Sequence, residues 1–510
     1  MTQFQLSIDT LREAYNSGKQ IISNHRVFVS DVDTPVSLYN KLNKYYDDCF
    51  LFESVLGGEN LGRYSFIGSA ALDTYMSFQS QTENPYDGLK DIVNNYSNNS
   101  TEDISSELNF FHQGMVGFFG FESMQRIEPC LELQSSHLPE SFFYLVGNLI
   151  VFDHVSQKLY LINNICLRSV QNEAQLEEKL KDSEAELKKL TEIIHEKNNL
   201  ERINFDIDGV NPATSFSSNT KKEEFIEMVN TAKEHILEGD IFQVVLSQRF
   251  EKETSINPLD LYRTLRSLNP SPYLFIFNVN LKDTEKNFSI VGSSPEMLIK
   301  SEKKLSYDNK TEIWAELRPI AGTYRRGANE CEDRKLAEKL LNDPKERAEH
   351  LMLLDLGRND LGRVCANGSI HVAQNMIIEK YSHVLHIVSS LKGKLKENMS
   401  SIELLKACFP AGTLSGAPKI EAVKIISKLE KSPRGPYGGC IGYINFDGTI
   451  NVAIMIRSLI LEKNKISIQA GAGVVADSDP ESEYQETFNK AAALMSAVER
   501  IKPENFSKVF

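Results

Sequence analysis

The sequence predicts an α+β protein, and three observations support this fold class. From residue 27 to residue 163, short apolar runs such as CFLFESVL, MVGFFGF and FFYLVGNLIVF are separated by glycine, asparagine and serine, which indicates the strands of a sheet. From residue 169 to about residue 202 the chain is charged, with leucines at helical spacing, which predicts a long surface helix. The second half combines helices that begin at proline with two strands around an Asp447-Gly448 turn.

The length of the chain bounds its organisation. At 510 residues it exceeds the size at which one hydrophobic core stops growing, so we expect two domains or one large interwoven one. We expect an N-terminal region at residues 1–205, a linker rich in turn formers at 206–220, and a C-terminal region at 221–505.

Composition excludes several classes of protein. No apolar run approaches the roughly 20 residues of a membrane-spanning helix, and the N-terminus lacks a secretory signal, so we expect a cytoplasmic protein without membrane contact. The net charge of −14 opposes binding to nucleic acid. The seven cysteines are scattered without a C-x-x-C pair, which argues against a zinc site or a disulfide framework.

Two predicted helices each carry carboxylates on one face. Glu346 and Glu349 lie three apart after Pro344, and Glu483 and Glu486 lie three apart in a helix that begins near residue 482. Carboxylates that converge from two elements suit Mg²⁺, which takes one or two of them beside water and ligand oxygens. By themselves, such glutamates are more often a solvated helix face.

Other residues are candidates for catalysis or binding, but their sequence context does not identify one reaction. Arg457 lies in the apolar run VAIMIRSLI, predicted to be a strand, where its charge needs either a protein carboxylate or an anionic substrate. Glu296, His386 and Thr413 are a plausible acid and base set, although each alone is more often structural. The glycine-rich runs GPYGGCIG and QAGAGVV complete neither a dinucleotide fingerprint nor a P-loop.

The order of the motifs is more specific than any one of them. GDIFQVVLSQRF, GSSPEM, RPIAGTYRRG, RAEHLMLLDLGRNDLGRV, YSHVLHIVSSLKGKL, FPAGTLSGAPK, RGPYGGCIGY and QAGAGVVADSDPESEYQETFNKA resemble, in this order, the chorismate-utilising enzymes. The resemblance spans residues 225 to 495. It implies two large, mainly antiparallel β-sheets packed as a sandwich, with helices outside and the active site between the sheets.

The resemblance also assigns roles to individual residues. It implies that Glu349 and Glu486 are Mg²⁺ ligands, and that Glu296 is the general acid that protonates the departing 4-hydroxyl of chorismate. His386 and Thr413 match positions associated with pyruvate elimination. The positions that bind substrate carboxylates are Gly322, Thr323, Tyr437, Arg457, Gly471, Ala472, Gly473 and Lys490.

Two positions separate the reactions within the family. Aminodeoxychorismate synthases often carry a nucleophilic lysine in a PIKGT motif, where this chain has Ala321. Isochorismate and salicylate synthases use a lysine base where this chain has Gln243. Both differences favour ammonia as the nucleophile, and therefore the anthranilate synthases, which are lyases of tryptophan biosynthesis.

A third feature that favours an anthranilate synthase lies in the N-terminal region. Leu51-Phe52-Glu53-Ser54 resembles the LLES motif with which anthranilate synthases bind tryptophan, with Phe52 in place of a leucine. The segment NPSPY resembles the one that completes that site. The resemblance therefore implies feedback inhibition by L-tryptophan bound at Ser54, Pro272, Tyr273 and Leu274.

These expectations combine into one reaction. Chorismate and ammonia give 2-amino-2-deoxyisochorismate, and loss of pyruvate gives anthranilate. No amidotransferase segment is found, so ammonia from glutamine requires a separate glutamine amidotransferase subunit, and we expect a hetero-oligomer. The alternatives are an aminodeoxychorismate or aminodeoxyisochorismate synthase, and a catalytically inactive tryptophan sensor.

Overall fold

A computed structural model of the chain describes residues 6–56, 60–97, 108–203, 215–281, 287–306, 308–381 and 384–501. Most of the predicted linker at 206–220 lies outside the described residues. Within them, no helix is long and apolar enough to cross a membrane. All seven cysteines are free thiols.

The larger of two sheets has twelve described strands, all paired antiparallel. Its main order is β1-β10-β9-β5-β2-β13-β14-β23-β24-β12-β11, and β20 pairs with β12 at the side. The strands are β1 (Ile21–Val29), β2 (Phe50–Glu53), β5 (Tyr64–Ser69), β9 (Asn148–Asp153), β10 (Lys158–Cys166), β11 (Ser217–Ser218), β12 (Gln243–Glu253), β13 (Tyr273–Val279), β14 (Phe288–Ser294), β20 (Gly416–Ala417), β23 (Ser458–Glu462) and β24 (Lys465–Val474).

The smaller sheet has ten described strands, again antiparallel. Its main order is β17-β19-β16-β15-β22-β21-β7-β8-β6, with β18 paired to β19. The strands are β6 (Asp73–Ser77), β7 (Gly114–Phe119), β8 (Ser141–Leu145), β15 (Met297–Leu305), β16 (Thr311–Leu317), β17 (Ile320–Arg325), β18 (His371–Lys380), β19 (Val384–Lys394), β21 (Cys440–Asn445) and β22 (Ile450–Ile454). A short hairpin of β3 (Val55–Leu56) and β4 (Asn60–Leu61) stands apart.

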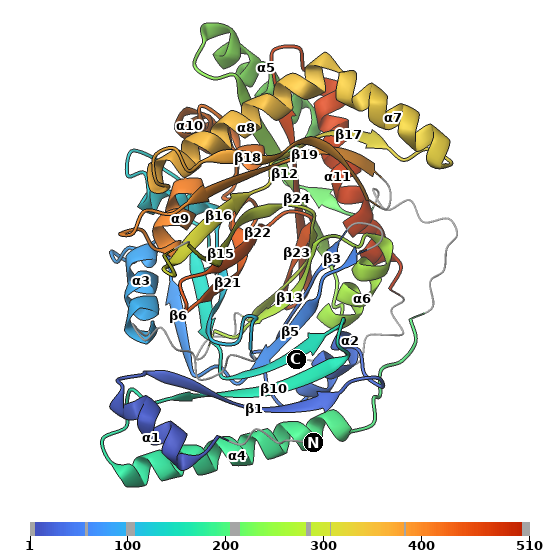
Figure 1. Ribbon diagram of the computed structural model, residues 1–510. Coiled ribbons are helices and arrows are strands. Elements are labelled where there is room, and N and C mark those ends of the chain that lie inside the picture. Colours follow the sequence, from blue (N-terminus) through green and yellow to red (C-terminus); the bar gives the residue numbers. More distant parts are fainter. Residues whose placement is uncertain are drawn as a thin grey trace.

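Helices lie outside the two sheets. Figure 1 shows α4 along β1 and β10 at one end of the molecule, and α8 at the opposite end. The described helices are α1 (Ile8–Asn16), α2 (Pro35–Leu42), α3 (Pro85–Tyr96), α4 (Glu173–His195), α5 (Lys222–Glu238), α6 (Pro258–Leu268), α7 (Glu330–Asn342), α8 (Pro344–Val364), α9 (Ser401–Cys408), α10 (Lys419–Leu429) and α11 (Pro480–Glu499), with short 3-10 turns η1 (Phe121–Arg126) and η3 (Gly412–Leu414).

An aromatic core joins the sheets face to face. Phe277 of the larger sheet lies 6.4 Å from Phe118 and 6.2 Å from Phe142 of the smaller sheet, between ring centroids, in edge-on geometry. All three rings are fully buried, and such rings contribute more than their buried area alone. The predicted α+β sandwich of two antiparallel sheets is therefore confirmed.

Strands from both sides of the predicted linker share both sheets. In the larger sheet β2 pairs with β13, and in the smaller sheet β7 pairs with β21. The strands β2 and β7 precede residue 206, whereas β13 and β21 follow residue 220. The regions before and after the linker are thus interwoven through backbone hydrogen bonds.

Local signals account for the helices that carry site residues. Helix α8 begins at Pro344, and the Asp343 side chain caps it by accepting from two backbone N–H groups. Helix α11 likewise has proline at its start, with Asp479 as the cap. The strand predicted through VAIMIRSLI is wrong in its middle, because β22 ends at Ile454 and Arg457 adopts a positive φ of 51° before β23.

Candidate active site

The site is built where the chain passes from one sheet to the other. Glu296 lies between β14 of the larger sheet and β15 of the smaller one, and Arg457 lies between β22 and β23, which cross in the opposite direction. The two crossings are hydrogen bonded to each other at 3.0 Å, from Ile454 N to Glu296 O and from Ser293 N to Arg457 O. These backbone hydrogen bonds hold the segment of Glu296 next to the segment of Arg457, although the two are far apart in the sequence.

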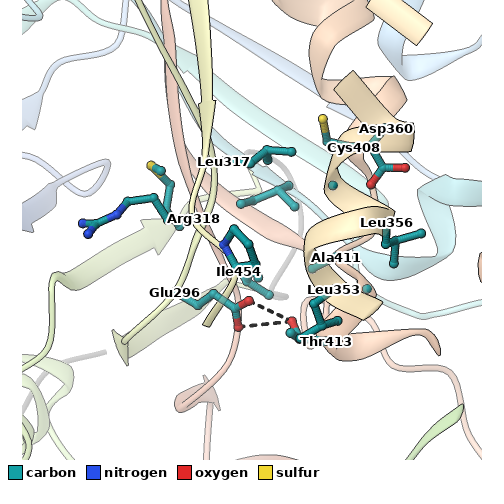
Figure 2. A pocket seen from close by; sticks show the side chains of 15 residues that line it. Glu296, Leu317, Arg318, Leu353, Leu356, Asp360, Cys408, Ala411, Thr413 and Ile454 are labelled. Carbon is teal, nitrogen blue, oxygen red and sulfur yellow. Dashed lines mark hydrogen bonds between the residues drawn. The ribbon is translucent and has the colours of Figure 1, made fainter. Parts of the chain in front are cut away.

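The Glu296 carboxyl is buried and has one hydroxyl partner. Figure 2 shows Thr413 pointing at it, and the Thr413 hydroxyl donates to the two carboxyl oxygens at 3.0 and 3.1 Å. Burial raises the pKa of Glu296 to about 8, while the Thr413 hydrogen bond and the Lys490 charge oppose that rise. Glu296 therefore carries a proton at neutral pH and is able to donate it.

A cavity of about 50 Å³ borders this carboxyl. Its walls are mostly aliphatic and come from β15, β16, α8 and the α9–η3 turn, as Figure 2 shows. The apolar lining residues include Leu317, Pro319, Leu353, Leu356, Ala411 and Ile454. These walls deprive the carboxylate form of Glu296 of hydration, which is the cause of its raised pKa.

His386 is positioned by β17, the neighbouring strand. Its Nδ1 lies 3.0 Å from both the Gly322 carbonyl oxygen and the Thr323 hydroxyl. A carbonyl only accepts, so the Gly322 contact places the proton on Nδ1 and leaves Nε2 unprotonated in the neutral ring. Burial lowers the pKa of His386, so the neutral ring, which is a base at Nε2, is favoured.

Four carboxylates from two helices face one another. Burial raises the pKa of Glu349, and the charges of Glu346 and Glu486 raise it further. Burial and the charge of Glu486 also raise the pKa of Glu483. Their mutual repulsion falls when a cation joins them. No three of the four have oxygens within 4.8 Å of one another in the part of the chain described, so they do not form a three-carboxylate site. Mg²⁺ typically takes only one or two protein carboxylates beside water and ligand oxygens.

Lys490 links this acidic group to the glycine strand β24. Its Nζ lies 2.7 Å from Glu486 Oε1 and donates to the Gly471 carbonyl at 3.0 Å. A Cβ at Gly471 would lie 2.9 Å from the Tyr437 hydroxyl, and one at Gly473 would lie 2.7 Å from Gln243 Nε2. Gly471 and Gly473 thus let these side chains approach the backbone, and Ala472 between them is buried.

Arg457 is a cation in need of an anion. Its guanidinium has no hydrogen bond or ion pair to any of the described residues. Burial lowers the pKa of Arg457, and the nearby Tyr437 and Glu486 only partly oppose that effect. An anionic ligand would remove this cost, which favours the substrate alternative over a protein carboxylate.

The residues expected to bind tryptophan form a second group. Ser54 follows β2, and its neighbour Glu53 is paired with Leu274 of β13. Pro272 is buried just before Tyr273, which begins β13. The structure therefore brings both predicted segments together.

Sequence reasoning did not single out Arg434 or Ser293. Arg434 is buried with four hydrogen bonds from its guanidinium, and its only signal in the sequence is its place in the RGPYGG motif. Ser293 hydrogen bonds to Arg457 through its backbone and to the Asn269 carbonyl through its hydroxyl. Its place in GSSPEM does not reveal these partners.

Comparison with known proteins bears on the same residues. The model of the chorismate binding enzyme family matches residues 19–496. Anthranilate synthase component 1 of Synechocystis sp. is 41% identical over 511 residues, covering 93% of this chain and 95% of that protein.

Solved structures agree with the fold. Anthranilate synthase component I from Streptococcus pneumoniae has a TM-score of 0.72 and 32% identity, over 92% of this chain and 99% of that one. The menaquinone-specific isochorismate synthase from Escherichia coli, at 18% identity, shares the fold with a TM-score of 0.71 over 97% of this chain and 100% of its own. With its acid, paired carboxylates and glycine strand in place, the chain belongs to the chorismate binding enzyme family, in the group of anthranilate synthase component 1.

Proposed function

We propose that this protein makes anthranilate: it replaces the 4-hydroxyl of chorismate by adding ammonia at C2, then eliminates pyruvate. The observation that carries the proposal is the buried, protonated Glu296, together with a group of carboxylates joined to Lys490 and an arginine that has no partner among the described residues. The likeness to anthranilate synthase component 1 over nearly the whole chain supports it.

In the first step Glu296 donates its proton to the departing 4-hydroxyl, which leaves as water. Ammonia forms the new bond at C2 as the ring double bonds shift. Gln243 is buried beside Gly473, and an amide side chain does not remove a proton from water. Ala321 provides no amine for a covalent intermediate. Ammonia, which needs no base to become nucleophilic, fits this environment.

In the second step His386 Nε2 removes the proton from C2, and the enolpyruvyl group leaves as pyruvate. The Nδ1 contact with the Gly322 carbonyl holds the tautomer that this role requires. Thr413 would assist elimination as a hydroxyl donor, next to the acid with which it already shares a hydrogen bond.

Substrate carboxylates would bind between Arg457, Lys490 and Tyr437 on one side and the backbone of Gly322, Thr323 and residues 471–473 on the other. Glu349 and Glu486 would hold Mg²⁺, which when bound neutralises the ring carboxylate. Lys490 now pairs with Glu486, so cation binding at Glu486 would free the Lys490 ammonium for substrate.

The ammonia source would be a separate glutamine amidotransferase subunit. The name component 1, carried by the relatives, supports a partner component and a hetero-oligomer. We further place the enzyme in the cytoplasm, at the start of tryptophan biosynthesis. L-Tryptophan would inhibit it by binding at Ser54, Pro272, Tyr273 and Leu274, and chorismate and tryptophan would oppose each other reciprocally.

The purified chain should convert chorismate with Mg²⁺ and ammonium chloride into fluorescent anthranilate and an equal amount of pyruvate, because free ammonia replaces the partner. Fluorescence and lactate dehydrogenase-coupled assays measure the two products. An aminated product without pyruvate would instead identify an aminodeoxychorismate or aminodeoxyisochorismate synthase. Tryptophan binding without any turnover would indicate an inactive sensor.

Glu349→Gln and Glu486→Gln should each abolish Mg²⁺-dependent turnover, since one carboxylate alone holds Mg²⁺ weakly. Steady-state assays against Mg²⁺ concentration, with circular dichroism to verify the fold, measure the effect. Glu481→Gln is the matched control, because Glu481 lies on the same helix but pairs with Lys222 at the surface. Wild-type Mg²⁺ dependence in either test variant would remove that residue from the metal site.

The kcat/KM for chorismate should fall as pH rises through about 8, because Glu296 acts only while protonated and its pKa in the free protein is raised to about 8. The Thr413 hydroxyl stabilises the carboxylate, so Thr413→Val should move this alkaline limb to higher pH. Rates measured from pH 7 to 10 with a constant concentration of free ammonia test both statements. A flat profile to pH 10 would contradict the role of Glu296.

Ser54→Ala should raise the tryptophan concentration for half-inhibition about tenfold, the loss expected for one hydrogen bond to a charged group. Inhibition curves at fixed chorismate measure it, with the rate in the absence of tryptophan as reference. An unchanged inhibition constant would mean that tryptophan, if it binds, does so elsewhere.

A further inference from the structure

Arg434 lies in the loop between α10 and β21, and only 3% of it is exposed. Its guanidinium makes four hydrogen bonds. Nε and Nη2 donate to the Glu430 carboxylate at 2.9 and 2.6 Å, Nη1 donates to the Leu414 carbonyl at 2.6 Å, and Nη2 donates to the Val245 carbonyl at 2.8 Å. A planar guanidinium fixes all these partners in one geometry.

The partners belong to separate segments of the active site. Leu414 follows Thr413, whose hydroxyl donates to the Glu296 carboxyl. Val245 lies two residues after Gln243 on β12, the strand paired with residues 471–474 of β24. The guanidinium carbon also lies 5.6 Å from the ring centroid of Tyr437. The Arg434 side chain thus contacts the Thr413–Leu414 turn, strand β12 and Tyr437, which all contribute to the proposed substrate site.

Two buried carboxylates hold Arg434 itself in place. Glu430 accepts from the Ser247 backbone N–H and hydroxyl at 2.8 Å while it pairs with Arg434. Glu122 accepts from the backbone N–H of Arg434 at 2.6 Å. Both oxygens of the Glu430 carboxylate are therefore hydrogen bonded, which helps this buried pair to offset its desolvation and to hold one geometry.

We propose that Arg434 is a positioning residue of the amination reaction, which sets the Thr413 hydroxyl against Glu296 and aligns β12 and Tyr437 with the bound substrate. It does not contact Glu296 and transfers no proton. This role rests on the proposed function. Its effect on chemistry passes through the Leu414 carbonyl to Thr413, and its effect on substrate binding passes through Tyr437.

Arg434→Lys tests the role, because lysine retains the charge beside Glu430 but cannot span the Leu414 and Val245 carbonyls together. We expect the turnover number to fall about 10²-fold, as for a misplacement near 1 Å. We also expect the alkaline limb to move to higher pH, since Thr413 would no longer stabilise the Glu296 carboxylate. Rates with ammonium at saturating Mg²⁺ across pH 7 to 10 measure both changes.

Arg126→Lys is the matched control. Arg126 also pairs with a buried carboxylate, Glu140, at 2.9 Å, and donates to the Gln81 carbonyl at 2.7 Å, but it contacts no segment of the site. It should lower the thermal midpoint while leaving the turnover number and the pH profile as in the wild type. Wild-type kinetics in Arg434→Lys, or losses in both variants that follow their thermal midpoints, would overturn the proposal.

Amide hydrogen exchange gives a readout that does not depend on activity. Exchange at residues 243–247 and 411–417 should be faster in Arg434→Lys than in Arg126→Lys, and equal rates would overturn the proposal even if the wild-type chain proved inactive. An inactive wild type would contradict the proposed function alone. If Arg434→Lys does not fold, Glu430→Gln should show both effects at smaller size, and wild-type exchange and kinetics there would also overturn the proposal.

Discussion

The candidate site depends on keeping the Glu296 carboxyl uncharged although the site also contains several charged side chains. Glu296 achieves this because it lies in a crossing between the two sheets, where aliphatic side chains exclude water and a single hydroxyl approaches it. The carboxylates of α8 and α11 lie on helices instead, where Lys490 and solvent offset their charge. Position in the fold, rather than residue type, separates the acid from the proposed metal ligands.

The same crossings connect the segments proposed to bind tryptophan with the candidate active site. Strand β13 starts at the proposed tryptophan segment and pairs with β14, which ends at Ser294 just before Glu296. Ser293 is hydrogen bonded to both Asn269 and Arg457. Backbone contacts therefore connect the 269–274 segment with the segments that carry Glu296 and Arg457, which is the connection that the proposed inhibition by tryptophan needs.

Local signals such as Pro344 and the three-residue spacing of the glutamates were sufficient to predict helices at α8 and α11. That the glutamates of the two helices converge was implied only by the resemblance to the family. The order of the motifs predicted the fold of two packed sheets. The roles that the resemblance assigns to individual residues remain proposals, which the geometry supports. Local signals failed at Arg457, where an apolar run resembles one strand but divides between two sheets at a positive φ. They also missed Arg434, because its partners lie up to 312 residues away in the chain. Contacts of this range leave no periodic trace in a single sequence.

The charges of the site are balanced only when ligands are present. Arg457 has no described partner, and burial lowers its pKa, whereas the glutamates near Glu349 repel one another. An anion alone would satisfy Arg457 but add to the negative charge near Glu486, and a divalent cation alone would leave the Arg457 guanidinium without a partner among the described residues. A cation and a carboxylate substrate together would remove both costs, so we expect binding of one to strengthen binding of the other.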